Sequence, residues 1–360
     1  MSPTGFKVLA INPGSTSTKL ALFEDERPLW TETLRHGDEQ LKAFRDRPVL
    51  DQLGFRLEGV LRALEAHGVR LEELSAVVGR GGLLKPLPSG TYRVNDAMLQ
   101  DLRAAKRGEH ASNLGAFLAH EIAKRAGCPA FVVDPVSVDE WPPIARLSGL
   151  KGLDREPLSH ALNTKAVAKR FAKERDKRYE ELRLIVAHLG SGFSISAHEG
   201  GRMVDVTNSR EEGAFSTERA GSLPVMKLAE LCFSGRYTLK DVERMVFREG
   251  GLYSYLGTRE LREVLRRIER GDEYAKLVFD AMIYQIAKEV GAMATVLKGR
   301  VDAILITGGL AHSPEVVEGV KARIRWIAPV YVYPGEDELR ALAEGALRAL
   351  RGEEPARDYA

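Results

Sequence analysis

A segment near the start of the chain combines the residue types that bind a phosphate group. It reads Asn-Pro-Gly-Ser-Thr-Ser-Thr-Lys and follows a short apolar run, which predicts a strand, a glycine turn and a second strand. Glycine lets backbone N–H groups approach an anion, hydroxyl groups add donors, and lysine adds charge. A plain hairpin with a polar turn is the alternative, but the density of donors favours phosphate binding. The candidate residues are Asn12, Gly14, Ser15, Thr16, Ser17, Thr18 and Lys19.

The second half of the chain repeats this plan. Residues 184–197 read LIVAHLGSGFSISA, again an apolar strand, a Gly-Ser turn and a strand of small or polar residues. The two segments align at a constant separation of 176 residues, for example 188 − 12. The repeat predicts two related domains that face each other across a cleft, with both hairpins binding one phosphate chain. The candidates in the second hairpin are His188, Gly190, Ser191 and Gly192.

A third glycine turn follows the apolar run 303–307 and contains Gly308, Gly309 and Leu310. Backbone that no side chain covers allows a flat base or a ribose to come close. A tight connection between a strand and a helix explains the same residues, and without the two hairpins it would be the better explanation.

Three charged residues lie where they could face a ligand. Arg80 in VGRGG and Arg219 in STERAG are framed by glycines and small residues, where a guanidinium can bind a carboxylate or a phosphate through two hydrogen bonds. An ordinary surface arginine is the alternative for each. Asp134 ends an apolar strand, and carboxylates at such ends face the ligand crevice of α/β folds, although a turn cap is equally common.

The histidines and cysteines predict no zinc site. Of eight histidines, His188 lies beside a glycine turn, whereas His110 and His160 lie near predicted helix starts and could be caps. The two cysteines are too few for a disulfide framework, and no His/Cys cluster has zinc spacing. A divalent metal would be Mg²⁺, held by one or two carboxylates and by substrate phosphates.

The 360-residue chain alternates short apolar runs with longer helical patterns, which predicts an α/β fold. A net charge of +2 and no long apolar segment predict a soluble, cytoplasmic protein that binds neither nucleic acid nor membrane. Helices are expected from 114 to Gly127 with Ser112 as the N-cap, from a Thr238–Asp241 capping box, and over 339–350. Apolar residues from Val278 to Leu297 form one face of a further long helix that ends at Gly299. The predicted strands are 7–11, 19–23, 76–78, 130–133, 184–188, 193–197, 203–206, 303–307 and 330–332.

Four stretches resemble the carboxylate kinases of the acetate kinase family, and the butyrate kinase branch in particular. They read LAINPGSTSTKLALFED, VGRGGLLKPLPSGTYRVNDAM, VAHLGSGFSISAHEGGRMVDVTNSREEGAFSTERAG and ITGGLAHS. The resemblance runs nearly end to end and implies a duplicated actin-like ATPase (ribonuclease H-like) fold. It implies a first domain of residues 1–155 completed by a C-terminal helix at 338–360, and a second domain at 156–337 with the nucleotide site.

The resemblance also implies an activity and a role for each matched residue. The family uses ATP and Mg²⁺ to convert a short-chain fatty acid to an acyl phosphate, with ADP as the second product. Arg80 matches the arginine that binds the carboxylate, Arg219 the one that stabilises the moving phosphoryl group, and Asp134 the catalytic aspartate. The two hairpins match the phosphate-binding segments, and Gly308 to Leu310 match the adenosine loop. A homo-oligomer is implied as well.

Some family features are displaced or missing. The acetate kinase motif Phe-His-Gly-Thr-Ser-His is reduced to its final Ser-His, so the catalytic histidine could be His160 or His188. The carboxylate that helps to place Mg²⁺ should be Glu336, Asp337 or Glu338, and the register leaves the three open. This missing motif and a chain shorter than an acetate kinase favour the butyrate branch. Isobutyrate, propionate and acetate stay open as acceptors, as does a sugar kinase of the same fold.

Overall fold

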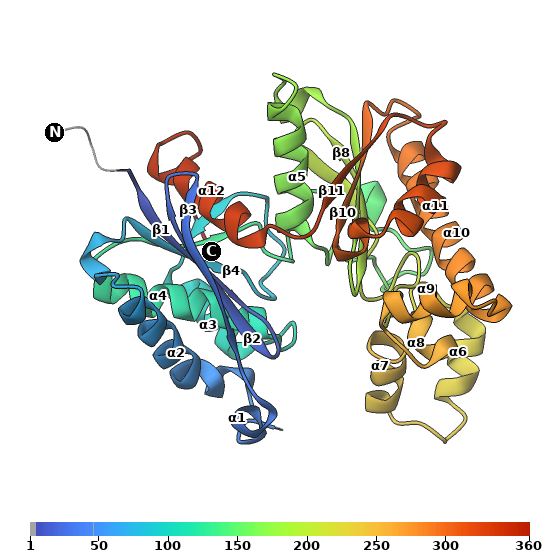
Figure 1. Cartoon of the computed structure of the whole chain (residues 1–360), viewed down its shortest axis with the longest axis horizontal. Helices are drawn as coiled ribbons and strands as arrows, with labels where there is room; N and C mark the ends of the chain where they lie inside the picture. Colours follow the sequence, from blue (N-terminus) through green and yellow to red (C-terminus); the bar gives the residue numbers. More distant parts are fainter. Residues whose placement is uncertain (1–4, 46) are drawn as a thin grey trace. The chain divides into compact units, whose positions relative to one another are not determined.

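The computed structural model describes residues 5–45 and 47–360, and the chain divides into two compact units. The first runs up to Asp139 and resumes at Asp337, and the second spans Glu140–Glu336. The sequence predicts that the first domain ends at residue 155. In the structure it ends at Asp139, and residues 140–155 belong to the second unit. Each unit contains one β-sheet with helices packed on it (Figure 1).

The first unit has a seven-stranded sheet in the order β12-β5-β6-β4-β1-β2-β3. Strands β1, β4 and β6 are parallel neighbours, while β1, β2 and β3 form an antiparallel meander. The central strands are continuous apolar runs because both of their faces are covered. The strands are β1 (Lys7–Pro13), β2 (Ser17–Glu24), β3 (Arg27–Arg35), β4 (Ala76–Arg80), β5 (Thr91–Arg93), β6 (Ala130–Val133) and β12 (Arg357–Asp358).

Helices cover this sheet and supply most of its core. Leu114, Leu118 and Ile122 on one face of α4 pack with Val60 and Leu64 of α2 against the sheet. The last helix also packs on β1, β4 and β6, so the C-terminal segment belongs to the first unit. The helices are α1 (Asp38–Lys42), α2 (Leu53–Ala66), α3 (Asp96–Ala104), α4 (Leu114–Ala126) and α12 (Glu338–Leu350).

The second unit has a five-stranded sheet in the order β11-β10-β7-β8-β9. Strands β7, β10 and β11 are parallel, and β7, β8 and β9 form a second antiparallel meander. The order β4-β1-β2-β3 in the first unit therefore has its counterpart in β10-β7-β8-β9. The strands are β7 (Leu184–Leu189), β8 (Phe193–Glu199), β9 (Arg202–Val206), β10 (Ala303–Gly308) and β11 (Val330–Pro334).

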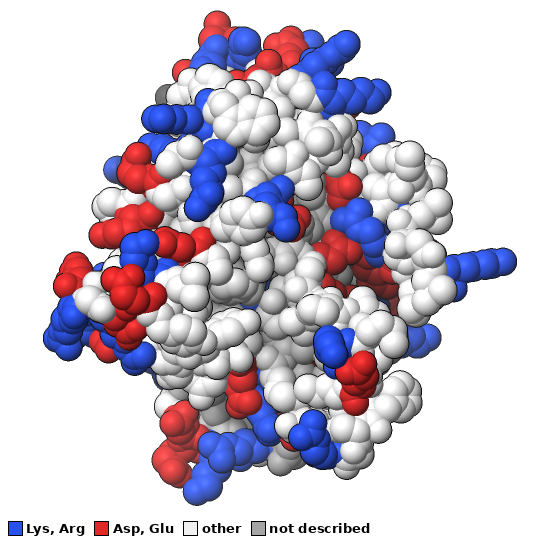
Figure 2. Space-filling model, turned by 90° about the vertical axis from the view of Figure 1, so that its right-hand side faces the viewer, with Lys and Arg blue, Asp and Glu red and all other residues white. Residues whose placement is uncertain are grey.

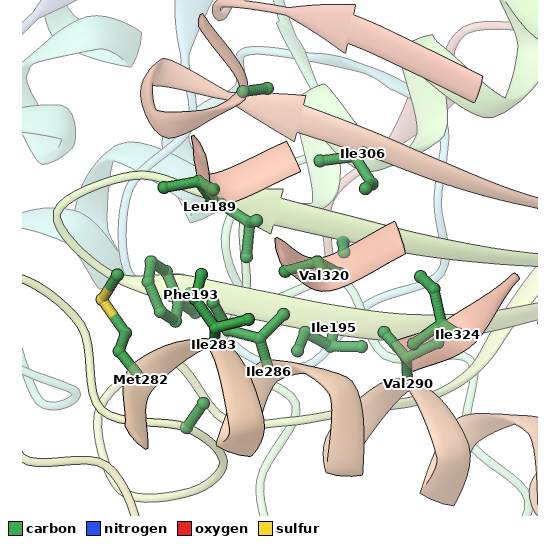
Figure 3. Packing of buried hydrophobic residues seen from close by; sticks show 14 of the residues in the cluster. Leu189, Phe193, Ile195, Met282, Ile283, Ile286, Val290, Ile306, Val320 and Ile324 are labelled. Carbon is green, nitrogen blue, oxygen red and sulfur yellow. The ribbon is translucent and has the colours of Figure 1, made fainter. Parts of the chain in front are cut away.

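One large apolar core fills the space between this sheet and the long helix α10. Phe193 and Ile195 of β8 and Leu189 of β7 face Met282 and Ile286 of α10, as Figure 3 shows. Burial of such side chains stabilises the unit by roughly 1.5–3 kcal/mol each. The helices are α5 (Ala161–Lys173), α6 (Val225–Cys232), α7 (Leu239–Phe247), α8 (Gly251–Leu256), α9 (Leu261–Glu269), α10 (Glu273–Val296) and α11 (Pro314–Ile324).

Every predicted strand and helix is present, although α10 ends at Val296, before Gly299, and the N-cap predicted for α4 is wrong. Ser112 does not cap α4: it lies in a short 3₁₀ turn, Ala111–Asn113, whose own cap is the His110 side chain. The predicted capping box of Thr238 and Asp241 starts α7, and Gly127 ends α4 in the left-handed conformation. In residues 5–45 and 47–360, no helix combines the length and apolar character that crossing a bilayer requires.

Candidate functional site

The first hairpin brings its polar residues to an exposed turn between β1 and β2. Asn12 pairs with Lys19 across the ladder, and Gly14 N–H donates to Ser17 O at 2.8 Å. Asn12 is buried, while Lys19 and the tip residue Ser15 are exposed. The structure therefore places Asn12 and Lys19 on the same face of this hairpin.

Thr18 lies on the opposite face of β2 and is fully buried. Its hydroxyl accepts from Arg56 Nη1 at 3.0 Å and lies 2.9 Å from His36 Nε2. These two partners occupy the hydroxyl, so Thr18 holds the hairpin to α2 and β3 from behind. The Thr18 side chain therefore lies on the face of the hairpin opposite Asn12 and Lys19, and its role in phosphate binding stays a prediction.

Buried histidines make the stability of the protein depend on pH. Burial, assisted by the charge of Arg56, lowers the pKa of His36 to about 4, and burial lowers that of fully buried His198 to about 3, with Lys165 adding to the shift. Unfolding returns both groups to a pKa near ~6.5, so the unfolded chain binds more protons in between. This contribution to stability is complete above pH 6.5 and is lost as the pH falls towards 4 and then 3.

The free energy of unfolding, measured by urea denaturation, is therefore expected to fall between about pH 6.5 and pH 4. In His198→Gln the side chain at this position cannot gain a proton, so the free energy of unfolding should depend less on pH than in the wild type. A free energy of unfolding that stays constant over the range would contradict the assignment.

Asn12 and Arg80 converge on one carboxylate. Asn12 Nδ2 donates to Glu338 Oε2 at 2.5 Å, and Arg80 Nη1 donates to the same oxygen at 2.6 Å. Glu338 is the first residue of α12 and is 5% exposed, whereas the Arg80 side chain is 19% exposed. The carboxylate thus fixes one edge of the guanidinium, while Nε and Nη2 of Arg80 donate to no acceptor within residues 5–45 and 47–360.

The glycines around Arg80 allow the end of β4 to approach its neighbours. A Cβ added at Gly79 would overlap the backbone of Gly115 at the start of α4, and one at Gly81 would lie 2.5 Å from Pro135 Cβ. The close approach sets the position from which Arg80 extends. The glycine cluster therefore has a packing reason in addition to any role in leaving room for a ligand.

Asp134 follows β6 in a strained conformation, with φ at +37°. Its Oδ1 accepts from Ser89 Oγ at 2.6 Å and from Gly90 N–H at 2.8 Å, and the residue is 4% exposed. Oδ2 makes no hydrogen bond in the part of the chain that the structure describes. These contacts orient the carboxyl group and leave one oxygen available.

The second hairpin brings two imidazoles together. The rings of His160 and His188 stack with centroids 4.0 Å apart. His188 Nδ1 lies 2.8 Å from the acceptor Asn163 Oδ1, and His160 Nδ1 lies 2.9 Å from Ser194 Oγ. Glu336 Oε1 lies 3.0 Å from His188 Nε2 but out of line for a hydrogen bond. His188 is fully buried, so these groups hold its ring in place behind the Gly190 turn.

Arg219 lies flat against this second turn. A Cβ added at Gly192 would be 2.5 Å from Arg219 Cζ, so only glycine permits the contact. Arg219 Nη1 donates to Ser209 O at 2.7 Å, and Ser216 Oγ donates to Ser191 O while accepting from Arg219 N–H. Burial lowers the pKa of the Arg219 guanidinium, which nevertheless stays charged in proteins. The arginine is thus fixed beside the turn.

The third glycine turn also borders the second hairpin. Gly308 ends β10 with φ at +92° and approaches the backbone of Leu189 so closely that a Cβ would overlap it. It exchanges backbone hydrogen bonds with Gly335, and Gly309 and Leu310 then enter a 3₁₀ turn, Gly309–His312. A Cβ at Gly309 would meet nothing within 4 Å, so this position is open.

The structure gives different surroundings to the three consecutive carboxylates, of which Glu336 ends the second unit and Asp337 and Glu338 belong to the first. Glu336 lies beside His188, Asp337 is exposed and pairs with Arg340 at 2.9 Å, and Glu338 is the buried partner of Arg80. The sequence could not distinguish them because they are consecutive or nearly so. The predicted helix 339–350 gave one clue to Glu338: this residue directly precedes that helix, and a carboxylate is favoured at a helix N-terminus.

Sequence reasoning missed the residues that hold the candidate groups in place. Asn163 and Ser194 orient the two histidines, Ser89 orients Asp134, and Ser216 ties the Arg219 loop to the hairpin. Ser194 alone had a sequence signal, since it lies in the repeated segment. The structure pairs it with His188 as it pairs Lys19 with Asn12.

Comparison with known proteins supports the fold and finds a match to a family model over part of the chain. Residues 155–327 match the model of the acetokinase family. An acetate kinase from Porphyromonas gingivalis matches with a TM-score of 0.79 and 21% identity, over 96% of this chain and 100% of that one. A propionate kinase from Francisella tularensis subsp. tularensis matches with 0.75 and 18%, over 94% and 98%. An acetate kinase from Entamoeba histolytica matches with 0.75 and 15%, over 95% and 99%.

The predicted fold class is confirmed by these matches. The chain as a whole thus has the two-sheet α/β fold of acetate and propionate kinases, which is the actin-like ATPase fold, and residues 155–327 are similar to the acetokinase family.

Proposed function

We propose that the protein transfers a phosphoryl group from ATP to a short-chain fatty acid, with butanoate as the expected acceptor, and releases an acyl phosphate and ADP. One observation carries this proposal: each unit has a glycine-turn hairpin accompanied by a fixed arginine. Arg80 is held by Glu338 beside Asn12, and Arg219 is held against Gly192. Two such arginines suit a reaction between two anions.

The acceptor needs no general base. A carboxylic acid with a pKa near ~4.3 is already ionised at neutral pH, so it can attack phosphorus directly. Its difficulty is repulsion by the triphosphate, which positioning and fixed positive charge overcome. Arg80 would bind the carboxylate through its remaining N–H groups, and Arg219 would stabilise the charge on the transferred phosphoryl group.

The other candidates support these two arginines in the proposal. The hairpin turns, with Lys19 and His188, would bind the phosphates, and Gly308, Gly309 and Leu310 would lie against the adenosine. His160, which stacks on His188, would hold the second hairpin in register. Because the ionised carboxylate of the acceptor is itself a nucleophile, we propose direct in-line transfer with inversion at phosphorus; retention would indicate a phosphoenzyme and contradict the proposal.

Mg²⁺ is the metal that such a reaction requires, and the residues present fit it. Asp134 keeps Oδ2 available, and Glu338 keeps Oε1, while Mg²⁺ typically takes one or two protein carboxylates together with substrate phosphates. No cluster of three or more His, Cys, Asp or Glu suited to a metal occurs among the described residues. When bound, the ion would neutralise phosphate charge. Glu336, beside His188, is the remaining candidate.

Trapping the product with hydroxylamine tests the proposed activity. The protein, ATP, Mg²⁺ and butanoate should form butanohydroxamate, which requires an activated acyl group, together with ADP rather than AMP, which identifies that group as an acyl phosphate. A sugar kinase of this fold would form none and would instead phosphorylate a sugar. This alternative has a basis in the fold, because a putative N-acetylmannosamine kinase from Listeria monocytogenes matches with a TM-score of 0.52 at 14% identity. An ATPase that acts as a binding module would release phosphate alone.

The preference among acids is expected to favour butanoate over acetate by about ten- to two-hundredfold in kcat/KM, the range that one or two methylene groups provide. Initial rates over a series from acetate to pentanoate, with isobutyrate included, measure it. Equal values for acetate and butanoate would show that the butyrate assignment is wrong while leaving carboxylate kinase activity intact.

We also propose a homo-oligomer in the cytoplasm. The second unit exposes large apolar side chains that a second copy would cover, and α6 and α7 have no buried residues at all. Figure 2 shows the side of the molecule with α10 and α11, where charges of both signs surround a broad uncharged area. Light scattering tests this proposal. The exposed side chains are Val225, Met226, Phe233, Leu239, Tyr255, Leu277 and Tyr284.

A further inference from the structure

Arg56 is a buried cation with no carboxylate partner among the residues that the structure describes. It lies on α2, is 1% exposed and forms no ion pair there. Burial lowers its pKa to about 10, so the guanidinium is charged at neutral pH. An uncompensated buried charge is costly, and such a cost is retained where the group has a task.

All five N–H donors of Arg56 make hydrogen bonds, and their acceptors lie on α2 and in the first hairpin. Nε and Nη2 donate to Gln52 Oε1 at 3.0 and 2.8 Å, which fixes the plane of the guanidinium. Nη1 donates to Ser17 O and to Thr18 Oγ1, both at 3.0 Å, and Nη2 donates to Ser15 O at 3.1 Å. Arg56 therefore grips the turn of the first hairpin from the side opposite Asn12.

The bond to Ser15 O fixes the direction of one backbone donor. The peptide bond is planar and trans, so Thr16 N–H points away from Ser15 O and hence away from Arg56. His36 N–H donates to the next carbonyl, Thr16 O, at 2.9 Å, which holds the other side of the same residue. Within the described chain, Thr16 N–H has no acceptor.

We propose that Arg56 is a positioning residue for phosphate binding: it orients the Ser15–Thr16 peptide so that Thr16 N–H points outward to a nucleotide phosphate. This proposal rests on the proposed function. Arg56 itself touches no substrate. Its charge, unpaired behind the turn, also raises the positive potential at the place where the anion binds.

Binding measurements on the full chain test the proposal without any carboxylate. In calorimetry with Mg²⁺ present, Arg56→Met is expected to weaken ATP about tenfold or more, the loss expected for a hydrogen bond to a charged group. Adenosine, which carries no phosphate, should bind within about twofold of wild type. Arg56→Lys keeps the positive charge but loses the planar guanidinium with its several N–H donors, so it should bind ATP more tightly than Arg56→Met and more weakly than wild type.

Two controls separate positioning from stability. Arg62→Met alters an exposed arginine of the same helix, whose contact with Glu58 is 3.9 Å, and should leave ATP affinity unchanged. Thr18→Val removes one acceptor of Arg56 but leaves Ser15 O bound, so its ATP affinity should change less than threefold. If Arg56→Met does not fold, the ATP affinities of Arg56→Lys and Thr18→Val test the proposal in its place.

ATP binding by Arg56→Lys equal to wild type would overturn the proposal, as would a parallel loss of adenosine binding, which indicates general disruption. Failure of the proposed function is distinguishable. A wild-type protein that binds ATP but makes no acyl phosphate would refute carboxylate kinase activity and leave the role of Arg56 standing.

Discussion

Arg219→Ala is expected to lower kcat about a thousandfold while the protein stays folded. The arginine lies against Gly192, is tied to Ser209 O and to Ser216, and is the fixed cation of the second hairpin. A preorganised cation acts where charge develops in the transition state, and losses of about 10²–10⁵ are typical when one is removed. The KM for ATP should change far less than kcat.

Two further variants sharpen this expectation. Gly192→Ala introduces a Cβ 2.5 Å from Arg219 Cζ, so the guanidinium must move and kcat should fall although the arginine is present. Arg244→Ala removes an exposed arginine that pairs with Asp241 on α7, and should leave kcat within about twofold. If folded Arg219→Ala retains a third or more of the wild-type kcat, the proposed role is wrong.

Glu338→Gln is expected to lower kcat about a hundredfold and to raise the KM for the carboxylate. Oε2 of Glu338 accepts from Asn12 and Arg80, so a neutral amide loses the charge that anchors both side chains. An Arg80 guanidinium released from its anchor loses the orientation on which reaction rate depends steeply. Breaking a buried ion pair also costs stability, so the melting temperature should fall.

The adjacent carboxylate provides a matched control. Asp337→Asn alters an exposed residue paired with Arg340 and should leave kcat, KM and the melting temperature nearly unchanged. Equal effects of Glu338→Gln and Asp337→Asn, or unchanged kinetics in folded Glu338→Gln, would contradict the assignment of Glu338 to the Arg80 cluster.

Most of the strands and the helices α4, α7, α10 and α12 could be predicted because local patterns determine them, whereas other helices, among them α2 and α11, were not predicted. Apolar runs such as 184–188 mark strands covered on both faces, and the Thr238–Asp241 box marks the start of a helix. Strands β3, β5 and β12 were not predicted. β5 and β12 have only three and two residues and exist through their neighbours in the sheet, whereas β3 lies at the edge of its sheet, has no buried residue and so lacks an apolar run. The start of α4 at Leu114 was predicted correctly, but its N-cap was not, because Ser112, which has a good capping side chain, lies in a 3₁₀ turn that begins at Ala111.

The candidate site was predictable where glycine marks a turn, and not where the determinant is a distant partner. Gly14 and Gly190 predict the turns of the two hairpins from the sequence alone. Arg56 gives no such signal, because an arginine on a helix is ordinarily exposed and only the fold turns this one towards Ser15 O. In the same way, it is the packing of α12 onto β1 and β4 that brings Glu338, rather than Glu336, to Arg80.

The fate of the carboxylate oxygen tests the central claim most directly. Butanoate labelled with ¹⁸O in both oxygens, incubated with the protein, ATP and Mg²⁺, should give an acyl phosphate whose bridging oxygen is ¹⁸O. Hydroxylamine then attacks the carbonyl carbon, the C–O bond to phosphate breaks, and the released phosphate should carry one ¹⁸O, visible as an isotope shift in ³¹P NMR. Phosphate that contains no ¹⁸O would show that the carboxylate never attacked phosphorus and would contradict the account.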